Sequence, residues 1–201
     1  MQNPFIKITE IKCGKVTEAQ NSLWEGLILL MREKPVYEIG VKQLCQVAHV
    51  ARSTFYVYYQ NVDELLEEIE NYHIIKLLGL NHDIMVNKCY DENSVAFYEE
   101  TMLYLEEYKK TFYCFLVAYP NVRFIEKWKE AIKYHVWERG FGRNEIKNNK
   151  LLLEMAASEI MAAYTFWLQH PYEVDISGVN RIIVNTIRAW DYKAEKIQQI
   201  F

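Results

Sequence analysis

The chain has 201 residues, which is enough to bury a hydrophobic core in one large domain or two small ones. Hydrophobic residues make up 51% and aromatic residues 14% of it, a composition that excludes a disordered chain, and only 7 Gly and 4 Pro favour helices over a turn-rich β architecture. No apolar run is expected to reach the length of a membrane span, and the first residues lack the apolar segment of a secretory signal.

The formal net charge of -4 is unevenly distributed. Residues 1–60 carry 7 Lys and Arg against 5 Asp and Glu, a balance of +2, and the rest of the chain carries -6. A slightly cationic head on an acidic body suits a protein that holds DNA at one end only. The 4 cysteines are scattered without C-x-x-C or zinc spacing, which predicts reduced thiols in a cytoplasmic protein.

Residues 1–15 are predicted to form a flexible arm, whose lysines either reach DNA phosphates or are simply solvated. A first helix is expected over 18–34. Thr17 and Gln20 have the spacing of a capping box at its start, and Pro35 ends it.

Residues 41–59 (VKQLCQVAHVARSTFYVYY) predict two short helices, about 41–48 and 52–58, that meet at a tight turn. Apolar residues at helical spacing converge on one side of both helices: Leu44, Ala48, Val50, Phe55 and Tyr59. The small Cys45 stands where two crossing helices approach closely. This is the layout of a helix-turn-helix, whose second helix enters the DNA major groove. A generic helical hairpin with a solvated polar face is the alternative.

The run IGVKQLCQVAHVARSTFYVYYQNVDELL, with the helix before it, resembles the DNA-binding domain of TetR-family transcriptional regulators. The matching features are the hydrophobic-small pattern of LCQVA, the V-x-R-S-T-F-Y sequence, the pair Tyr58–Tyr59 and the D-E-L-L of the next helix. The resemblance covers about residues 16–66 and is specific there. Beyond that stretch it rests on length and helical character.

Four residues depart from the family pattern. His49 replaces a Gly in the turn, and His is among the few other residue types that tolerate a positive φ. Ala51 is a poor cap for the recognition helix, Val62 replaces a Lys that would contact a phosphate, and Gly40 replaces a Thr. We therefore expect the fold to survive while operator affinity and contacts differ from the family norm.

The candidate DNA-binding residues are Lys42, Ala51, Arg52, Ser53, Thr54, Tyr56 and Tyr58. We expect Arg52, Ser53 and Thr54 to touch bases or phosphates, because their donors suit those groups better than a core. The tyrosines and Lys42 would hold phosphates.

A fourth helix is expected from Asn61, capped by the Asn-x-x-Glu pattern, and its tilt would couple the body to the DNA. Residues 81–93 are predicted to be a connection. The remaining predicted helices lie near 94–107, 109–118, 121–139, 147–169 and 176–199.

The last two predicted helices are candidates for a dimer interface. Helix 147–169 is apolar nearly all round, and in the resembled family two such helices from each subunit form a four-helix interface. The candidate residues are Leu152, Met155, Ala156, Ile160, Ala163, Trp167, Val179, Ile183, Ile187 and Trp190. An ordinary intrachain core is the alternative.

No arrangement of residues indicates an enzyme, a metal site or a bound cofactor. The 5 histidines are spread out, with no second His and no Cys at i+3 or i+4, and neither a Gly-rich phosphate loop nor G-x-S-x-G occurs. The resemblance implies an effector pocket in the body instead, with core packing as the alternative. The candidate lining residues are His73, Tyr98, Met102, Tyr113, Trp128, Tyr134, Trp137, Met161 and Tyr164.

The sequence therefore predicts an all-α protein with a helix-turn-helix domain over 1–66 and a helical effector-binding and dimerisation domain over 67–201. The resemblance implies a cytoplasmic homodimer that binds pseudo-palindromic double-stranded operator DNA, usually as a repressor, and is released by an unknown small-molecule effector. The alternative is a helical protein-interaction module whose head has lost strong DNA affinity.

Overall fold

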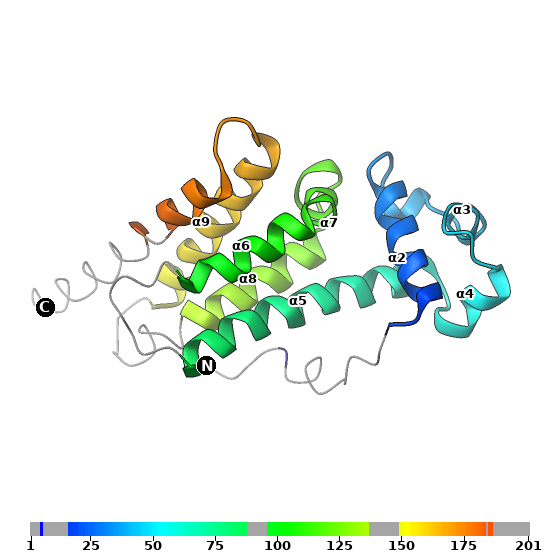
Figure 1. Cartoon of the computed structure of the whole chain (residues 1–201), viewed down its shortest axis with the longest axis horizontal. Coiled ribbons are helices and arrows are strands. Elements are labelled where there is room, and N and C mark those ends of the chain that lie inside the picture. The colour runs from blue at the N-terminus through cyan, green and yellow to red at the C-terminus, as the bar shows by residue number, and fades with distance from the viewer. Residues whose placement is uncertain (1–4, 6–15, 88–95, 137–148, 184, 187–201) are drawn as a thin grey trace, which may run out of the picture.

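The computed structural model describes residues 5, 16–87, 96–136, 149–183 and 185–186, and within these ranges the secondary structure is helical throughout. The predicted all-α class is confirmed. Figure 1 shows an elongated molecule in which three helices form a head at one end. A long helix runs from the head along a helical body at the other end.

The head begins with α2 (Glu18–Met31), followed by the short 3-10 helix η1 (Val36–Glu38). The predicted capping box is confirmed, because the Thr17 side chain accepts a bond from the Gln20 backbone and the Gln20 side chain accepts one from the Thr17 backbone. The helix ends at Met31, before the predicted 34. The Leu30 carbonyl accepts hydrogen bonds from the backbone N–H groups of Glu33 and Lys34, and this turn ends the helix before Pro35.

The helix-turn-helix is α3 (Val41–Val47) and α4 (Arg52–Tyr58), as predicted. His49 has a φ of 54°, so the turn does adopt the left-handed conformation for which the family pattern uses glycine. Phe55 is fully buried. Cys45 is buried too, and α2 comes close to α3 at Gly26, where an added Cβ would lie 3.1 Å from the Ala48 Cβ.

Helix α5 (Val62–Asn87) connects the head to the body and spans 26 residues. Asn61 caps it as predicted, because its side chain accepts a bond of 2.9 Å from the Glu64 backbone. The prediction of a connection from residue 81 is wrong as far as Asn87, since α5 continues to that point. The predicted boundary after residue 66 therefore falls inside a continuous helix.

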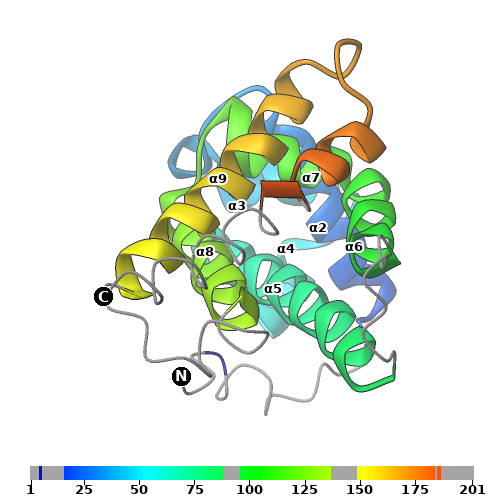
Figure 2. The same ribbon diagram turned by 90° about the vertical axis from the view of Figure 1, so that its left-hand side faces the viewer.

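The body contains α6 (Ala96–Glu107), α7 (Lys109–Tyr113), the π-helix η2 (Cys114–Ala118), α8 (Val122–Val136), α9 (Asn149–Gln169) and a helical segment at 176–183. These elements match the predicted helices closely, and the predicted helix 109–118 divides into α7 and η2. Figure 2 shows α8 and α9 on one side of the body and α6 on the other. Helix α9 packs along α8.

The apolar helix α9 and the N-terminal arm both bear on expectations from the sequence. Residues 150–169 of α9 are long and apolar enough to cross a membrane by length and composition, with a mean hydropathy of 1.3, although 44% of that window is buried within the fold. The expectation that no segment reaches that length is therefore wrong for α9. In the predicted arm, the structure describes Phe5, which is buried. The arm's lysines lie outside the described residues.

Candidate nucleic-acid interface and the body that positions it

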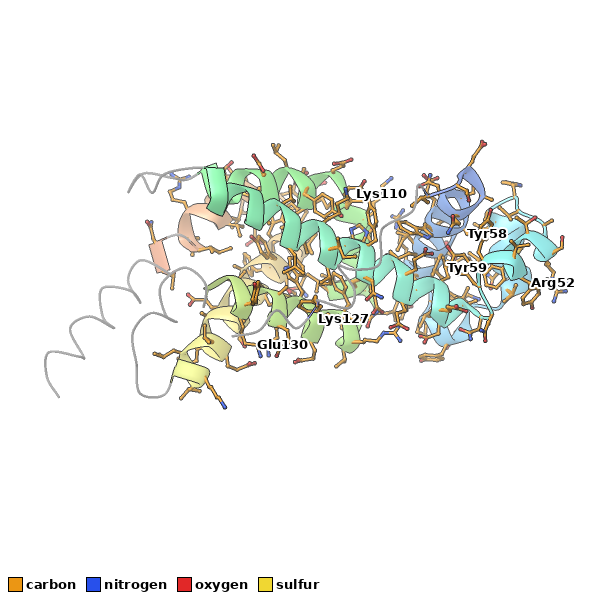
Figure 3. All side chains as sticks on the ribbon, turned by 90° about the horizontal axis from the view of Figure 1, so that it is seen from below. Arg52, Tyr58, Tyr59, Lys110, Lys127 and Glu130 are labelled. Carbon is orange, nitrogen blue, oxygen red and sulfur yellow. The ribbon has the colours of Figure 1, made fainter. Side chains whose placement is uncertain are left out.

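Helix α4 lies at the tip of the head, and Arg52 extends from the end of the molecule farthest from the body (Figure 3). Arg52, Ser53 and Tyr56 are exposed, whereas Thr54 and Tyr58 are half-buried. Lys42, the predicted phosphate contact of α3, is also exposed. The predicted DNA-binding residues therefore share the outer surface of the motif, and their contacts with DNA stay predictions.

The family departures have structural consequences in the head. Neither motif helix has a side-chain cap, since Gly40 precedes α3 and Ala51 precedes α4. The first backbone N–H groups of α4 are therefore left without an intrahelical or side-chain acceptor. Val62 is buried with 8% of its surface exposed, so it adds to the apolar core where a lysine would have reached outward.

Tyr59 holds the end of the recognition helix against the two helices behind it. Its hydroxyl donates to the Glu68 carboxylate of α5 and accepts bonds of 3.3 Å from both Trp24 and Gln20 of α2. Burial, followed by the bond to Glu68, raises the pKa of Tyr59 well above its usual value, so the hydroxyl keeps its proton. Sequence analysis assigned Tyr59 to the apolar side and missed this polar role, because its partners are distant in sequence.

A buried ionic cluster joins α5 to α8. The Glu70 side chain is fully buried and accepts bonds from Arg123 at 2.8 Å, Lys127 at 2.9 Å and Asn121 at 2.7 Å. Arg123 also reaches Asp63, in the first turn of α5, at 3.1 Å. Removing one partner of a buried pair costs about 3 kcal/mol or more. The cluster therefore resists any sliding or tilting of α5 against α8.

The body also contacts the head directly through η2 and the residue after it. Tyr119 donates a hydrogen bond of 2.7 Å to the Glu33 carbonyl, and the Cys114 thiol lies 3.5 Å from the Ile28 carbonyl. Burial raises the pKa of Cys114 to about 11, so it stays a thiol. A π-helix at this contact is notable, since such segments often lie at functional sites.

His73 of α5 sits in an aromatic cage in the body. Its Nδ1 lies 2.6 Å from the Tyr104 hydroxyl, and the rings of Tyr72, Tyr104, Tyr108 and Phe112 surround it at 5.1 to 5.8 Å between centroids. Burial lowers the pKa of His73 to about 3, so the imidazole is neutral at pH 7.

Several predicted pocket residues form one continuous aromatic group. Phe112 contacts both His73 and Trp128, with centroid distances of 5.3 and 5.2 Å, and Trp128 stacks on Tyr164 at 5.5 Å. Phe112, which was not among the predicted pocket residues, thus connects His73 to Trp128 and Tyr164.

The other predicted pocket residues have mixed positions. Met102 and Met161 are buried and Tyr134 is half-buried, whereas Tyr113 is 39% exposed and points away from the core. Trp137 and the side chain of Tyr98 lie outside the described residues.

Two buried polar side chains of the body have no hydrogen-bond partner among the described residues. They are Thr101 of α6, 5% exposed, and Asn180 of the segment 176–183, 1% exposed, with both polar atoms of its amide unpaired. Buried polar groups are nearly always paired in proteins, so these two positions call for a partner that is not among the described residues. Sequence analysis missed both, because burial was their only signal.

The predicted dimer residues divide according to their exposure. Ala156, Ile160 and Trp167 are buried within the chain, as are Val179 and Ile183, so they contribute to the core and not to a free surface. We therefore revise the candidate interface at these positions.

The exposed apolar residues of this region are Leu151 at 61%, Met155 at 46%, Phe166 at 44% and Ile182 at 59%. Of the predicted set, Met155 belongs to this surface, Leu152 and Ala163 are half-buried, and Ile187 and Trp190 lie outside the described residues. The three exposed residues of α9 recur at helical spacing and form one face.

No family model matches the chain. The transcriptional activator DhaS of the dhaKLM operon of Lactococcus lactis subsp. lactis is 28% identical over 101 residues, which are 46% of this chain and 52% of DhaS. The match thus spans about half the length of that relative.

Two solved structures share the architecture. A TetR transcriptional regulator from Streptococcus agalactiae has a TM-score of 0.65 at 15% identity, over 86% of this chain and 94% of its own. FadR from Bacillus subtilis, solved with stearoyl-CoA, has a TM-score of 0.66 at 12% identity, over 83% of this chain and 96% of its own. The chain therefore has the fold of TetR-family transcriptional regulators, with a helix-turn-helix head on a helical body.

The neutral, buried state of His73 predicts a loss of stability in weak acid. The pKa of His73 is about 3 in the fold against an ordinary value of 6.5 for histidine, so between these values only the unfolded chain binds the proton. Lowering the pH from 7 to 5 should therefore reduce the free energy of unfolding by about 2 kcal/mol through this residue.

Chemical denaturation of the wild type and of His73→Gln at both pH values measures this contribution. Gln does not titrate, so the variant should lose about 2 kcal/mol less between pH 7 and pH 5, whatever its absolute stability. Equal pH dependence in the two proteins would contradict the assignment.

Proposed function

We propose that the protein is a ligand-responsive transcriptional regulator that binds a pseudo-palindromic operator as a homodimer. The observation that carries the proposal is the outward placement of Arg52, Ser53 and Tyr56 on α4, while Phe55 and Tyr59 hold the opposite side of the helix in the core. A short helix presented this way fits the major groove. Such a protein works in the cytoplasm, where the DNA is.

A second copy is proposed to pair through the exposed apolar face of α9 with Ile182. Both lie in the body, away from the head (Figure 1). Pairing there leaves both recognition helices free and sets the distance between them, which must match about one helical turn of DNA between half-sites. It also covers apolar side chains that a monomer would leave in water.

An effector is proposed to bind in the body and to shift its conformation. The unpaired Thr101 and Asn180 side chains support this site, since a ligand with donor and acceptor groups would satisfy them. Helix α5 carries His73 of the aromatic cage as well as the Glu70 cluster, so a change around the cage reaches the head through this helix. The effector must prefer one arrangement to change operator affinity.

The sign of regulation that we propose is repression by occupancy of the operator, with release on effector binding. The Lactococcus lactis relative is named as an activator, so proteins similar to this chain are not confined to repression. Neither sign involves chemistry on a substrate, and the proposal assigns no catalytic role to any residue.

Operator binding is tested by electrophoretic shift with promoter DNA flanking the gene. Wild-type protein should retard a specific fragment, and the affinity should fall as salt rises because phosphate contacts release counterions. Arg52→Ala should weaken binding by about 1–3 kcal/mol if its guanidinium reads a guanine edge.

Arg32→Ala is the matched control for this measurement. Arg32 also lies in the head and is exposed, but it is close to Cys114 of the body and not on α4. Equal effects of the two substitutions would argue against base recognition by Arg52. No retardation at any salt would instead favour the protein-interaction module with a weakened head, which the uncapped α4 and the buried Val62 suggest.

The proposed dimer predicts that Met155→Glu separates the subunits, because a carboxylate would be buried against apolar side chains of the partner. Sedimentation at micromolar concentration should show a dimer for the wild type, with association weakened about tenfold or more in the variant. Leu103→Glu, at a residue of α6 that is 71% exposed, is the control and should stay dimeric. A monomeric wild type would rule out this proposal.

The effector site predicts an unusual stability change at Asn180. Without effector, Asn180→Leu removes a buried unpaired amide and should raise the free energy of unfolding by about 1–2 kcal/mol. The control is Asn121→Leu, which removes an amide that bonds Glu70 and caps α8 and should lower it by a similar amount. Destabilisation by both substitutions would mean that Asn180 is satisfied within the protein.

A further inference from the structure

Val57 occupies the centre of the outward face of α4. It lies two residues from each of the buried side chains Phe55 and Tyr59, which is about 200° of rotation from both on a helix of 3.6 residues per turn. Its exposure is 74%, higher than that of Tyr56 at 53%. Val57 therefore projects furthest from the core among the apolar residues of this helix.

The surroundings of Val57 on α4 are polar but nearly uncharged. Arg52 is the one formal charge in the seven residues of the helix, and Ser53, one turn before Val57, is exposed. Guanine is read mostly by Arg or Lys, so the centre of this face lacks the groups that recognise guanine. The major groove offers one apolar group at base edges, the C5-methyl of thymine.

We propose that Val57 is a specificity-determining residue that contacts the C5-methyl of one thymine in each operator half-site. The inference rests on the proposed function, since it needs α4 to enter the major groove. It adds an apolar residue of α4 that the predicted DNA-binding set omitted. Burying one methyl group accounts for about a fourfold change in affinity, so two symmetric contacts account for about sixteenfold.

The test begins with operators selected from random duplexes by the full-length wild-type protein. Each thymine of the selected site is then replaced by deoxyuridine, symmetrically in both half-sites, which removes only the C5-methyl groups. We expect one such symmetric replacement to weaken wild-type binding by about sixteenfold. Val57→Ala should bind the thymine operator about as weakly, and deoxyuridine at the same position should weaken it little further.

Two matched variants separate this contact from general effects. Val122→Ala changes a valine of α8 that is 70% exposed and should leave affinity and thymine preference intact. Ser53→Ala changes the same face as Val57 and should keep the wild-type ratio between thymine and deoxyuridine operators.

Three outcomes would overturn the proposal. In the first outcome, Val57→Ala leaves operator affinity unchanged. In the second, the loss of affinity caused by Val57→Ala and the loss caused by deoxyuridine are additive at every thymine. Either result would show that Val57 contacts no thymine methyl group. In both cases the proposed function would stand, because the wild type still binds its operator. If the wild type enriched no sequence, the proposed function itself would fail and this inference with it.

Discussion

The arrangement of the whole molecule depends on two carboxylates of α5 that lie two residues apart and so face opposite ways on the helix. Glu68 accepts a hydrogen bond from the Tyr59 hydroxyl at the end of the recognition helix, and Glu70 accepts hydrogen bonds from Arg123 and Lys127 of α8. One short stretch of α5 thus holds the head on one side and the body on the other. The contacts of η2 and Tyr119 with the head are a second connection between body and head.

The body separates its polar groups into two kinds. Charged groups form the cluster around Glu70, where Arg123 keeps part of its surface in water. They also form a second group, in which Lys129 and Lys133 of α8 pair with the partly exposed Glu154 of α9. Deeper positions carry neutral groups: the His73–Tyr104 pair and the unpaired Thr101 and Asn180. Desolvation penalises charge more than neutral polarity, so this division is the less costly one.

The sequence was sufficient for the parts of the protein that local physics controls. The spacing of apolar residues, the capping residues and the positions of Pro and Gly predicted most helices. The left-handed turn at His49 followed from its place at the glycine position of the helix-turn-helix pattern. The predictions differ from the structure where the outcome depends on contacts with other helices. Helix α5 continues to Asn87 instead of ending near residue 80. Ile160 and Trp167 of α9 are buried within the chain instead of lying on a free surface. An apolar residue on a helix looks the same in sequence whether it meets its own chain or a second copy.

By itself the sequence determined the helical class, the helix-turn-helix and the outward placement of Arg52, because those follow from residue types at short spacing. Only the tertiary structure decided which polar groups meet. The Tyr59–Glu68 bond and the cluster around Glu70 depend on contacts between helices far apart in the chain. Periodicity says which face of a helix is buried, but not which helix covers it.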